Sequence, residues 1–383
     1  MALSHDELLE IFSRLTAKII YKFTSTCKSF SKFPKDTYFA SKQAQNSLLR
    51  DDTCLFIQPA FPRLYKVQVE FHPLPGEEFS SGLPQSALKF FSYPVKILSS
   101  SNGLILCRTI GENEVKLFIT NPATQSWLPI PTPDEYKQNS MSIGLECDDK
   151  NGYMVYLFYA NLVDRSSANL DCKVYHSNEG VWKSKESRFF IGSRQLTFGM
   201  PVHHRGAVHF LSDCFPSVNP FFRLYIMSYN FETGNSRMLR VPEEARKGYY
   251  YLFPYNMRIF KWGKATDPNQ SICLVGLGND VFTIWTLTHY ETSEWRRVLK
   301  IRVKTIVKDH PIIKVQGYAV LNGDLLVFAT EKKVYGCGLN DMRIQEICDL
   351  KCEYNVLHFT SYKDTLRTCG TGALPLPSHK QCW

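Results

Sequence analysis

The sequence predicts a mainly β protein in which an N-terminal group of three short helices precedes a β-propeller of about six or seven blades. Three observations support this fold class. Apolar runs that follow a polar residue and a glycine recur about every fifty residues beyond residue 50, alternating strands joined by short turns lie between them, and residues 3–33 show helical spacing of apolar side chains.

The first helix is expected to begin at Ser4. Ser4 and Glu7 have the spacing of a capping box, in which the serine hydroxyl accepts a hydrogen bond from a free amide of the first turn and the glutamate reaches back to the cap. An apolar stripe at i, i+3, i+4 and i+7 follows and consists of Leu8, Ile11, Phe12 and Leu15. Two further apolar sets predict two more short helices: Ile19, Ile20 and Phe23, then Cys27, Phe30 and Phe33.

These helices contain more apolar surface than they can bury among themselves. A domain of fewer than about 50 residues is marginally stable because its surface is large relative to its volume. The remaining apolar side chains are therefore expected to pack against another protein, or against the rest of the chain as an ordinary helical cap.

The same segment resembles an F-box. In that family a leucine, usually followed by proline, opens the motif, and a helix of the form D-E-L-L-x-E-I-x-S-R-L, a P-x-K-S turn and a C-K-S-W stretch follow. The residues that match this pattern are Leu3, residues 6–11 and 13–15, Lys18 and residues 27–29. The departures are Ser4 for the first proline, Thr16 and Ile19 in the turn, and Phe30 for the tryptophan.

The resemblance implies that residues 1–48 form an F-box that docks on the Skp-type adaptor subunit of a cullin-RING ubiquitin ligase. By analogy with the family, the adaptor-binding side chains are expected to be Leu3, Leu8, Leu9, Leu15, Cys27 and Phe30. Packing of an apolar helix face into a groove is the expected mode of binding.

The length of 383 residues exceeds the usual range of a single core, so a small domain and one large domain are expected. An apolar content of 44% and a charged content of 21% are typical of a globular chain. No run of about 18 apolar residues and no signal-peptide pattern is present, so we expect a soluble protein of the cytoplasm and/or nucleus that binds no membrane. Residues 51–365 are assigned to the large domain, and residues 366–383, which lack periodicity, to a flexible tail.

Five segments beyond residue 50 share one pattern, which in four of them is a glycine after a polar residue and then an apolar run. They begin at Asn102, Asn151, Arg205, Ser271 and Asn322. The four glycines are separated by 49, 54 and 117 positions, and the last gap holds the Ser271 segment. This spacing indicates a repeat of about fifty residues, the length of one propeller blade.

The second half of each unit also repeats. Three segments each contain a strand, a turn and another strand, which predicts hairpins; they begin at Val115, Leu224 and Phe282. Tryptophans follow the turns at Trp127 and Trp295, with a weaker copy at Trp182. Aromatic side chains at equivalent strand positions fill the space between the sheets of a repeated β architecture. A pair of β-sandwiches is the alternative, although it does not require the repeat.

Part of this pattern resembles the F-box-associated domain of plant F-box proteins, in which S-x-N-G-L-L-x-L precedes N-P-A-T-R and a Leu-Pro pair. The corresponding residues here are 102–104, 121–124, Leu128 and Pro129, with Gln125 in place of the arginine. Residues 202–211 and 228–234 also fit that family. The resemblance implies a kelch-like propeller that binds an unknown target protein, as the substrate-recognition subunit of an SCF-type (Skp-cullin-F-box) ubiquitin ligase.

No catalytic residues, metal ligands or cofactor are expected, and the protein is expected to be a non-catalytic adaptor. The sequence lacks a Gly-rich phosphate loop, a G-x-S-x-G elbow, an H-E-x-x-H helix and a Cys-His nucleophile context. The twelve cysteines have no disulfide framework, and Cys348 and Cys352 lack a second pair at zinc-site spacing. The nearest approach to a histidine cluster is interpreted as structural and consists of His203, His204 and His209.

The residues that meet the target are less clearly marked. The tract from Gly248 to Tyr255 is aromatic; on an exposed loop it would form a recognition patch for a peptide or a glycan, whereas as a strand it would belong to the core. The candidate substrate-binding residues are Tyr249, Tyr250, Tyr251 and Tyr255. The net charge of +9 is spread along the chain and fits a solvated surface or an acidic partner, while nucleic-acid binding has no supporting motif.

Three functions follow from these features. The first is the ligase substrate receptor, and the second is a propeller that binds proteins or glycans and carries a degenerate, non-ligase F-box. The third is a propeller hydrolase, which would need a carboxylate cluster on one face that the sequence does not display.

Overall fold

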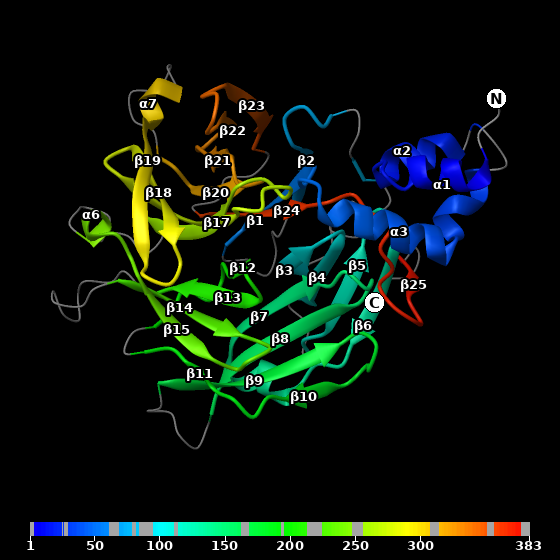
Figure 1. Ribbon diagram of the computed structural model, residues 1–383, viewed down its shortest axis with the longest axis horizontal. Helices are drawn as coiled ribbons and strands as arrows, with labels where there is room; N and C mark the ends of the chain where they lie inside the picture. The colour runs from blue at the N-terminus through cyan, green and yellow to red at the C-terminus, as the bar shows by residue number, and fades with distance from the viewer. Residues whose placement is uncertain are drawn as a thin grey trace.

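The computed structural model describes residues 4–24, 26, 30–60, 69–78, 82–83, 95–110, 114–161, 168–192, 195–212, 224–246, 256–306, 314–350 and 356–376. A group of helices lies at one side of six β-sheets, and the sheets are the blades of a propeller (Figure 1). The mainly β fold and the propeller that the sequence predicts are therefore confirmed, with six blades.

The N-terminal helices begin as the sequence predicts. Ser4 Oγ accepts a hydrogen bond from the amide of Glu7 at 3.3 Å, and Glu7 Oε2 accepts one from the amide of Ser4 at 2.7 Å, which completes the capping box. A further helix, which apolar periodicity does not indicate, is capped by the carboxylate of Asp36. The helical segments are α1 (His5–Phe12), α2 (Ala17–Thr24), the 3₁₀ helix η1 (Phe30–Lys35) and α3 (Thr37–Leu48).

Aromatic side chains form the core of this helical group, by which we mean α1, α2, η1 and α3. The ring of Phe12 lies 4.7 Å from that of Phe30 and 5.1 Å from that of Phe23, and Phe33 stacks on Phe39 at 4.9 Å. Such pairs contribute about 0.5–1.5 kcal/mol each beyond the area they bury. The aromatic cluster therefore stabilises helices that are too short to be stable individually.

Each blade is an antiparallel sheet. The first blade contains β1 (Cys54–Pro59), β2 (Glu70–Pro73) and β24 (Leu357–Tyr362), and the second contains β3 (Val95–Ser101), β4 (Leu104–Thr109), β5 (Leu117–Asn121), β6 (Ser126–Ile130) and β25 (Leu374–Pro375). The third contains β7 (Ser140–Cys147), β8 (Tyr153–Ala160), β9 (Asn169–His176), β10 (Trp182–Ser184) and β11 (Phe189–Phe190).

The fourth to sixth blades have four strands each, in chain order from the centre outward. They contain β12 (Val202–His204), β13 (Ala207–Leu211), β14 (Tyr225–Asn230) and β15 (Ser236–Arg240); β16 (Met257–Trp262), β17 (Ser271–Gly278), β18 (Val281–His289) and β19 (Glu294–Arg302); and β20 (Gly317–Leu321), β21 (Leu325–Ala329), β22 (Lys333–Gly338) and β23 (Ile344–Asp349). Short helices lie outside the sheets: α5 (Asp134–Asn139), α6 (Glu243–Arg246) and α7 (Val303–Ile306).

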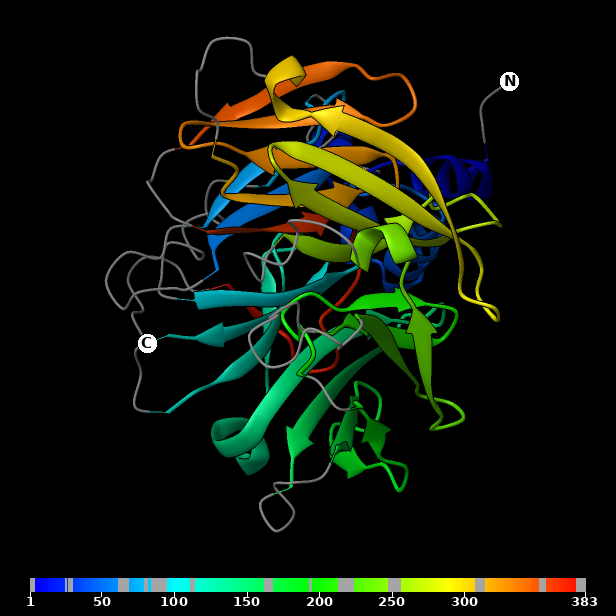
Figure 2. The same cartoon turned by 90° about the vertical axis from the view of Figure 1, so that its left-hand side faces the viewer.

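The ring is closed by strands from both ends of the chain. In Figure 2 the red β24 lies beside the blue β1, and the two pair from Cys54 opposite Tyr362 to Pro59 opposite Leu357. β24 also contacts β20 of the sixth blade and β3 of the second. The two ends of the chain thus contribute strands to one blade instead of forming two, and the ring has six blades rather than seven.

The five repeated segments are the second strands of their blades, namely β4, β8, β13, β17 and β21. The polar–glycine pairs that precede three of them have positive φ at both residues: 40° and 87° at Asn102 and Gly103, and 52° and 71° at Asn322 and Gly323, for example. Two adjacent residues with positive φ form the tight turn that matches the twist of antiparallel strands. The repeat thus reflects the turn from the innermost strand of a blade to the next.

Two of the three repeated tryptophans, Trp182 and Trp295, connect neighbouring sheets, whereas Trp127 Nε1 donates within its own blade, to the carbonyl of Pro375 at 3.1 Å. Trp182 Nε1 donates to the carbonyl of Pro131 at 2.7 Å, and Trp295 Nε1 donates to the carbonyl of Arg240 at 2.7 Å. In each case the acceptor belongs to the preceding blade or directly follows its outer strand. The outer edges of these blades are therefore joined by side-chain hydrogen bonds as well as by packing.

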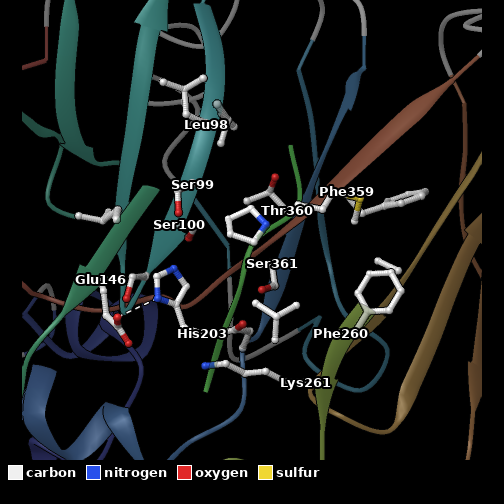
Figure 3. A pocket seen from close by; sticks show the side chains of 18 of the residues that line it. Leu98, Ser99, Ser100, Glu146, His203, Phe260, Lys261, Phe359, Thr360 and Ser361 are labelled. Atoms are coloured by element: carbon white, nitrogen blue, oxygen red, sulfur yellow. Dashed lines mark hydrogen bonds and ion pairs between the residues drawn. The ribbon is translucent and has the colours of Figure 1, made fainter. Parts of the chain in front are cut away.

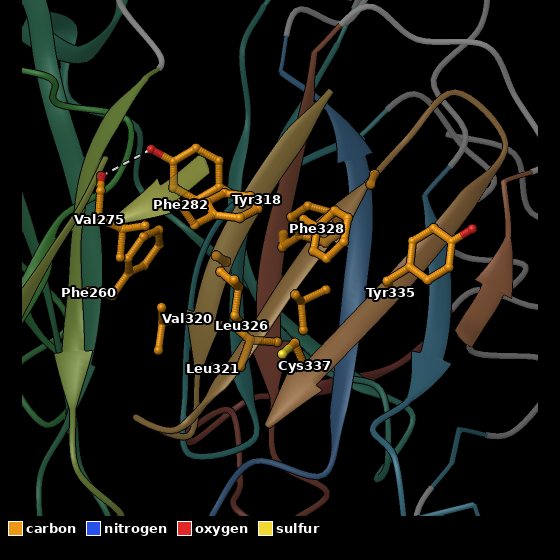
Figure 4. Packing of buried hydrophobic residues seen from close by; sticks show 14 of the residues in the cluster. Phe260, Val275, Phe282, Tyr318, Val320, Leu321, Leu326, Phe328, Tyr335 and Cys337 are labelled. Atoms are coloured by element: carbon orange, nitrogen blue, oxygen red, sulfur yellow. Dashed lines mark hydrogen bonds between the residues drawn. The ribbon is translucent and has the colours of Figure 1, made fainter. Parts of the chain in front are cut away.

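Most of the core lies between adjacent blades. Figure 4 shows the contact of the fifth and sixth blades, where the ring of Phe282 lies 5.3 Å from that of Tyr318 and 5.5 Å from that of Phe328. The hydroxyl of Tyr318 donates to the carbonyl of Val275 at 3.2 Å, so this buried polar group is satisfied.

The flexible tail expected from residue 366 onward is wrong for residues 366–376. Leu366, Arg367 and Cys369 are buried, and β25 pairs with β6, with Leu374 opposite Trp127. Arg367 donates to the carbonyls of Asp148 and Gly152 at 2.6 Å each. Order in this segment comes from contacts distant in sequence, which a lack of local periodicity does not reveal. Residues 377–383 lie outside the described residues.

Candidate functional site

Several of the side chains that the sequence predicts to bind the adaptor already make contacts within the helical group. Leu8, Leu9, Leu15 and Phe30 are partly buried and pack against its core. Leu3 and Cys27 lie outside the described residues. Adaptor binding by these six residues stays a prediction, because packing within the helical group and packing on a partner compete for the same side chains.

Other apolar side chains of the helices face outward. On α1 the apolar stripe is divided: Phe12 is 8% exposed, whereas its neighbour Ile11 is 47% exposed. Phe23 on α2 is 40% exposed although its ring contacts Phe12. Sequence periodicity places both residues on apolar faces but does not show which of them the neighbouring helices leave uncovered.

The helical group is packed on the propeller. Ala123, in the turn between β5 and β6, and Leu366 are buried in the same cluster as Phe12 and Ile20. The fully buried Gln43 of α3 bridges the two parts: its Nε2 donates to the carbonyl of Leu15, and its Oε1 accepts from the amide of Leu366, each at 2.9 Å. The helical group is thus a cap on the propeller that leaves Ile11 and Phe23 exposed.

Charged side chains of the propeller bind helix ends. Asp364 Oδ2 accepts from the amide of Lys18 at 2.9 Å, at the start of α2, and Lys363 Nζ donates to the carbonyls of Ser47 at 2.7 Å and of Arg50, at the end of α3. An anion at a helix N-terminus and a cation at a C-terminus both complement the helix dipole. Burial raises the pKa of Asp364 to about 7, although its hydrogen bond with Lys18 opposes this rise.

A cavity of about 840 Å³ occupies the centre of the propeller, and residues from the innermost strands of all six blades line it (Figure 3). The turns that follow these strands lie beside α3: Asn102 Nδ2 donates to the carbonyl of Ala44 at 2.9 Å, and Arg50 lines the cavity at the same end. We call this the helical end of the channel. The opposite end, where Lys96 of β3 and His358 of β24 lie near the starts of their strands, is the distal end.

The channel lining contains a partly buried pair of a histidine and a glutamate. His203 Nδ1 lies 2.8 Å from Glu146 Oε2 (Figure 3), and His203 Nε2 lies 3.2 Å from the hydroxyl of Tyr156. Burial alone would raise the pKa of Glu146, but the nearby His203 and Lys261 outweigh it and the pKa is lowered. Both ring nitrogens of His203 have partners on the third blade, so the histidine connects the third and fourth blades.

The other histidines of the expected cluster lie together against Tyr290, whose ring centroid is 6.1 Å from that of His204 and 5.6 Å from that of His209. His209 is fully buried; its Nε2 lies 2.7 Å from the hydroxyl of Tyr290, and burial lowers its pKa to about 3. The described residues contain no group of three histidine, cysteine or acidic side chains placed to hold a metal ion. The candidate substrate-binding residues Tyr249, Tyr250, Tyr251 and Tyr255 lie outside the described residues.

Comparison with known proteins relates most of the chain to one family. Residues 79–314 match a family model described as "F-box protein At3g26010-like, beta-propeller". Among curated proteins, the chain is 26% identical over 317 residues to "F-box protein At5g49610" of Arabidopsis thaliana, covering 80% of each chain. It is 23% identical over 201 residues to "Putative F-box/kelch-repeat protein At3g17570" of the same plant, covering 51% of this chain and 49% of the relative.

Solved structures are more distant. One titled "AtxE2 Isopeptidase - APO" has a TM-score of 0.31 and 10% identity, and covers 67% of this chain and 40% of its own. At these values the similarity says nothing about what this chain binds or does. Among the helices that the structure describes, none combines the length and the apolar character needed to cross a bilayer.

Proposed function

This chain belongs to the family of F-box proteins with an At3g26010-like β-propeller, and on that premise we propose that it is the substrate-recognition subunit of an SCF-type ubiquitin ligase. The helical group is then its F-box and docks on a Skp-type adaptor, which joins it to a cullin. The propeller holds the target protein. The chain performs no bond chemistry in this role; it raises the effective concentration of a target lysine near the charged conjugating enzyme. We place this activity in the cytoplasm and/or nucleus.

The observation that carries the proposal is the packed junction between helices and propeller. Gln43 and Asp364 bond the two parts together, and Leu366 is buried in the helical core. A target held by the propeller would then lie at a fixed position relative to the adaptor. Fixed geometry favours the proximity effect, because a flexible linker would spread the target over a large volume.

The outward-facing side chains Ile11 and Phe23 supply the surface for the adaptor. Each is about half exposed and extends the apolar core of the helical group to the surface. Truncating a central apolar anchor of a protein interface costs about 2 kcal/mol or more, which lowers affinity roughly thirtyfold. Because these two residues are less buried than Leu9 or Leu15, a charge at either position should disturb the fold less.

The test is co-purification of the full-length chain with a Skp-type adaptor. We expect Ile11→Asp combined with Phe23→Asp to abolish it while the unfolding temperature of the propeller is retained. Val181→Asp, at a residue that is 51% exposed on the β9–β10 turn, is the matched control and should bind as the unmodified chain does. Equal adaptor recovery with the double variant and the control would contradict this binding surface, and no recovery with the unmodified chain would contradict the ligase proposal.

One observation favours the second candidate, a protein- or glycan-binding propeller with a degenerate F-box. Four of the residues expected to contact the adaptor are half buried inside the helical group, and Phe30, which replaces the tryptophan of the family pattern, stacks on Phe12. If the adaptor fails to co-purify with the unmodified chain, this candidate takes the place of the first.

A further inference from the structure

The central channel has an uneven distribution of charge. The acidic side chains among its described lining residues are Asp51, Asp52 and Glu146. Asp51 Oδ2 lies 3.0 Å from Lys264 Nζ, Asp52 Oδ1 lies 3.9 Å from Lys363 Nζ, and Glu146 is paired with His203. The lining residues that the structure describes at the distal end include basic side chains but no carboxylate.

Two of these basic side chains lie side by side at the distal end. Lys96 on β3 and Arg108 on β4 are directly opposite each other in the antiparallel register, and both line the channel. Opposite residues of such a pair have Cβ atoms about 4.5–5.5 Å apart on one face of the sheet, and like charges there are destabilising. The fold therefore holds two positive charges close together in a partly buried place.

Among the described residues, no carboxylate pairs with Lys96 or Arg108. Within the described ranges, Lys96 Nζ has no hydrogen bond or ion pair, and the buried Nε of Arg108 has no partner. Arg108 bonds instead with the hydroxyl of Tyr136. Burial, and then the charge of Arg108, lower the pKa of Lys96. A half-buried charge without a counter-charge is costly unless a ligand supplies one.

The described residues that line the channel beside Lys96 and Arg108 add no negative charge. Burial, with the charges of Arg258 and Lys96, lowers the pKa of His358 to about 3, so its ring is neutral at physiological pH and can donate one hydrogen bond. Arg258 is buried and donates to the carbonyl of Tyr318 at 3.0 Å. Lys137 also lines the channel; it is exposed, and its Nζ lies 3.4 Å from Glu114 Oε1 and 3.8 Å from Asp134 Oδ1, two carboxylates that lie outside the lining.

From this arrangement we propose that the distal end of the channel is a binding site for a compact anionic group, a phosphate or a carboxylate, held between Lys96 and Arg108. An anion placed there would pair with both cations and remove their repulsion, and charge-assisted hydrogen bonds of this kind are among the strongest in proteins. The group belongs either to a free phosphorylated small molecule or to a side chain of a bound protein. The cavity, at about 840 Å³, has room for more than the anion alone.

The first experiment uses inorganic phosphate as the probe and the full-length protein. Phosphate at constant ionic strength, compared with chloride, should raise the unfolding temperature of the unmodified chain. Lys96→Met should lose this response and weaken phosphate binding about tenfold or more by calorimetry, because one of the two charge-assisted contacts is gone. The matched control Lys300→Met, at an exposed residue of β19, should respond as the unmodified chain does.

A second variant distinguishes loss of the anion site from loss of the fold. Lys96→Glu would place a carboxylate opposite Arg108 and so supply the missing anion from the chain itself. We expect it to unfold at a higher temperature than the unmodified chain in chloride and to show no response to phosphate. The proposal is overturned if Lys96→Met and Lys300→Met respond equally to phosphate, or if Lys96→Glu unfolds at a lower temperature than the unmodified chain in chloride.

Competition then identifies the source of the anion. Glucose 6-phosphate represents a free metabolite, and a phosphoserine peptide represents a protein side chain. Tighter competition with phosphate by the sugar phosphate supports a small-molecule ligand, and tighter competition by the peptide supports a protein ligand. Failure of both to compete overturns the site. None of these measurements requires the adaptor, so their failure is distinct from failure of the ligase proposal.

Discussion

The carboxylate of Asp364 accepts a hydrogen bond from the backbone amide of Lys18 at 2.9 Å, across more than three hundred residues of sequence. Asp364 is the second residue after the strand that closes the propeller, and Lys18 is in the first turn of α2. The propeller thus provides the anion at the N-terminus of a helix in the helical group. The other carboxylate oxygen, Oδ1, is buried without a partner among the described residues.

We expect this contact to make stability depend on pH. Burial raises the pKa of Asp364 from 3.8 to about 7 in the folded protein. Between these values the folded state binds more protons than the unfolded state, so this carboxyl contributes stability at low pH that is lost as the pH rises through about 7. Urea unfolding of the unmodified chain and of Asp364→Asn should therefore diverge across this range, by on the order of a few kcal/mol at most. The exposed Asp349→Asn is the control, and parallel pH profiles for the unmodified chain and Asp364→Asn would contradict the prediction.

Gln43 is expected to be essential for the junction of helices and propeller. Gln43→Leu would leave the carbonyl of Leu15 and the amide of Leu366 without their bonds, and a buried polar group left unpaired costs about 1–3 kcal/mol. Gln45→Leu, at an exposed position of the same helix, should change the free energy of unfolding by less than about 0.5 kcal/mol. Urea midpoints of the two variants test this, and equal midpoints would show that the bridge contributes little.

Alanine substitutions at two glycines should distinguish the cost of backbone strain from the cost of a steric clash. Gly76 and Gly103 have nearly the same φ, 86° and 87°, but an added Cβ meets nothing within 4 Å at Gly76 and lies 1.9 Å from Thr365 Oγ1 at Gly103. Gly76→Ala should cost about 1–2 kcal/mol for the left-handed conformation alone. Gly103→Ala should cost a further 1–3 kcal/mol or so from overpacking. Thermal unfolding distinguishes them, and similar losses in both variants would mean that Thr365 moves aside freely.

The segment 366–376 should be needed for a stable second blade. A chain that ends at Thr371 loses β25 and the carbonyl of Pro375, to which Trp127 Nε1 donates at 3.1 Å. A chain that ends at Leu376 keeps both and is the matched control. We expect the shorter chain to lose about 1 kcal/mol or more, as for an unpaired buried donor, and to expose Trp127 to a fluorescence quencher. Identical quenching in the two chains would contradict this role.

Local features of the sequence determined much of this protein. The Ser4–Glu7 capping box, the polar–glycine turns such as Asn322–Gly323, and the hairpin tryptophans Trp182 and Trp295 all depend on residues close together in the chain, and each is found where the sequence predicts it. Their repeat also predicts the propeller, because a fixed period implies equivalent blades.

Other features depend on contacts between residues distant in sequence, and only the tertiary structure shows them. The number of blades became six because β24 joins β1 in one sheet, and residues 366–376 are ordered because β6, Asp148 and Gly152 offer partners. Whether Ile11 or Phe12 faces outward depends on the packing of α2 and η1. The opposition of Lys96 and Arg108 likewise depends on strand register, since neither residue belongs to a recognisable motif. Periodicity shows which faces are apolar or charged. Only the folded chain shows which residues cover each face and which charges are left without a counter-charge.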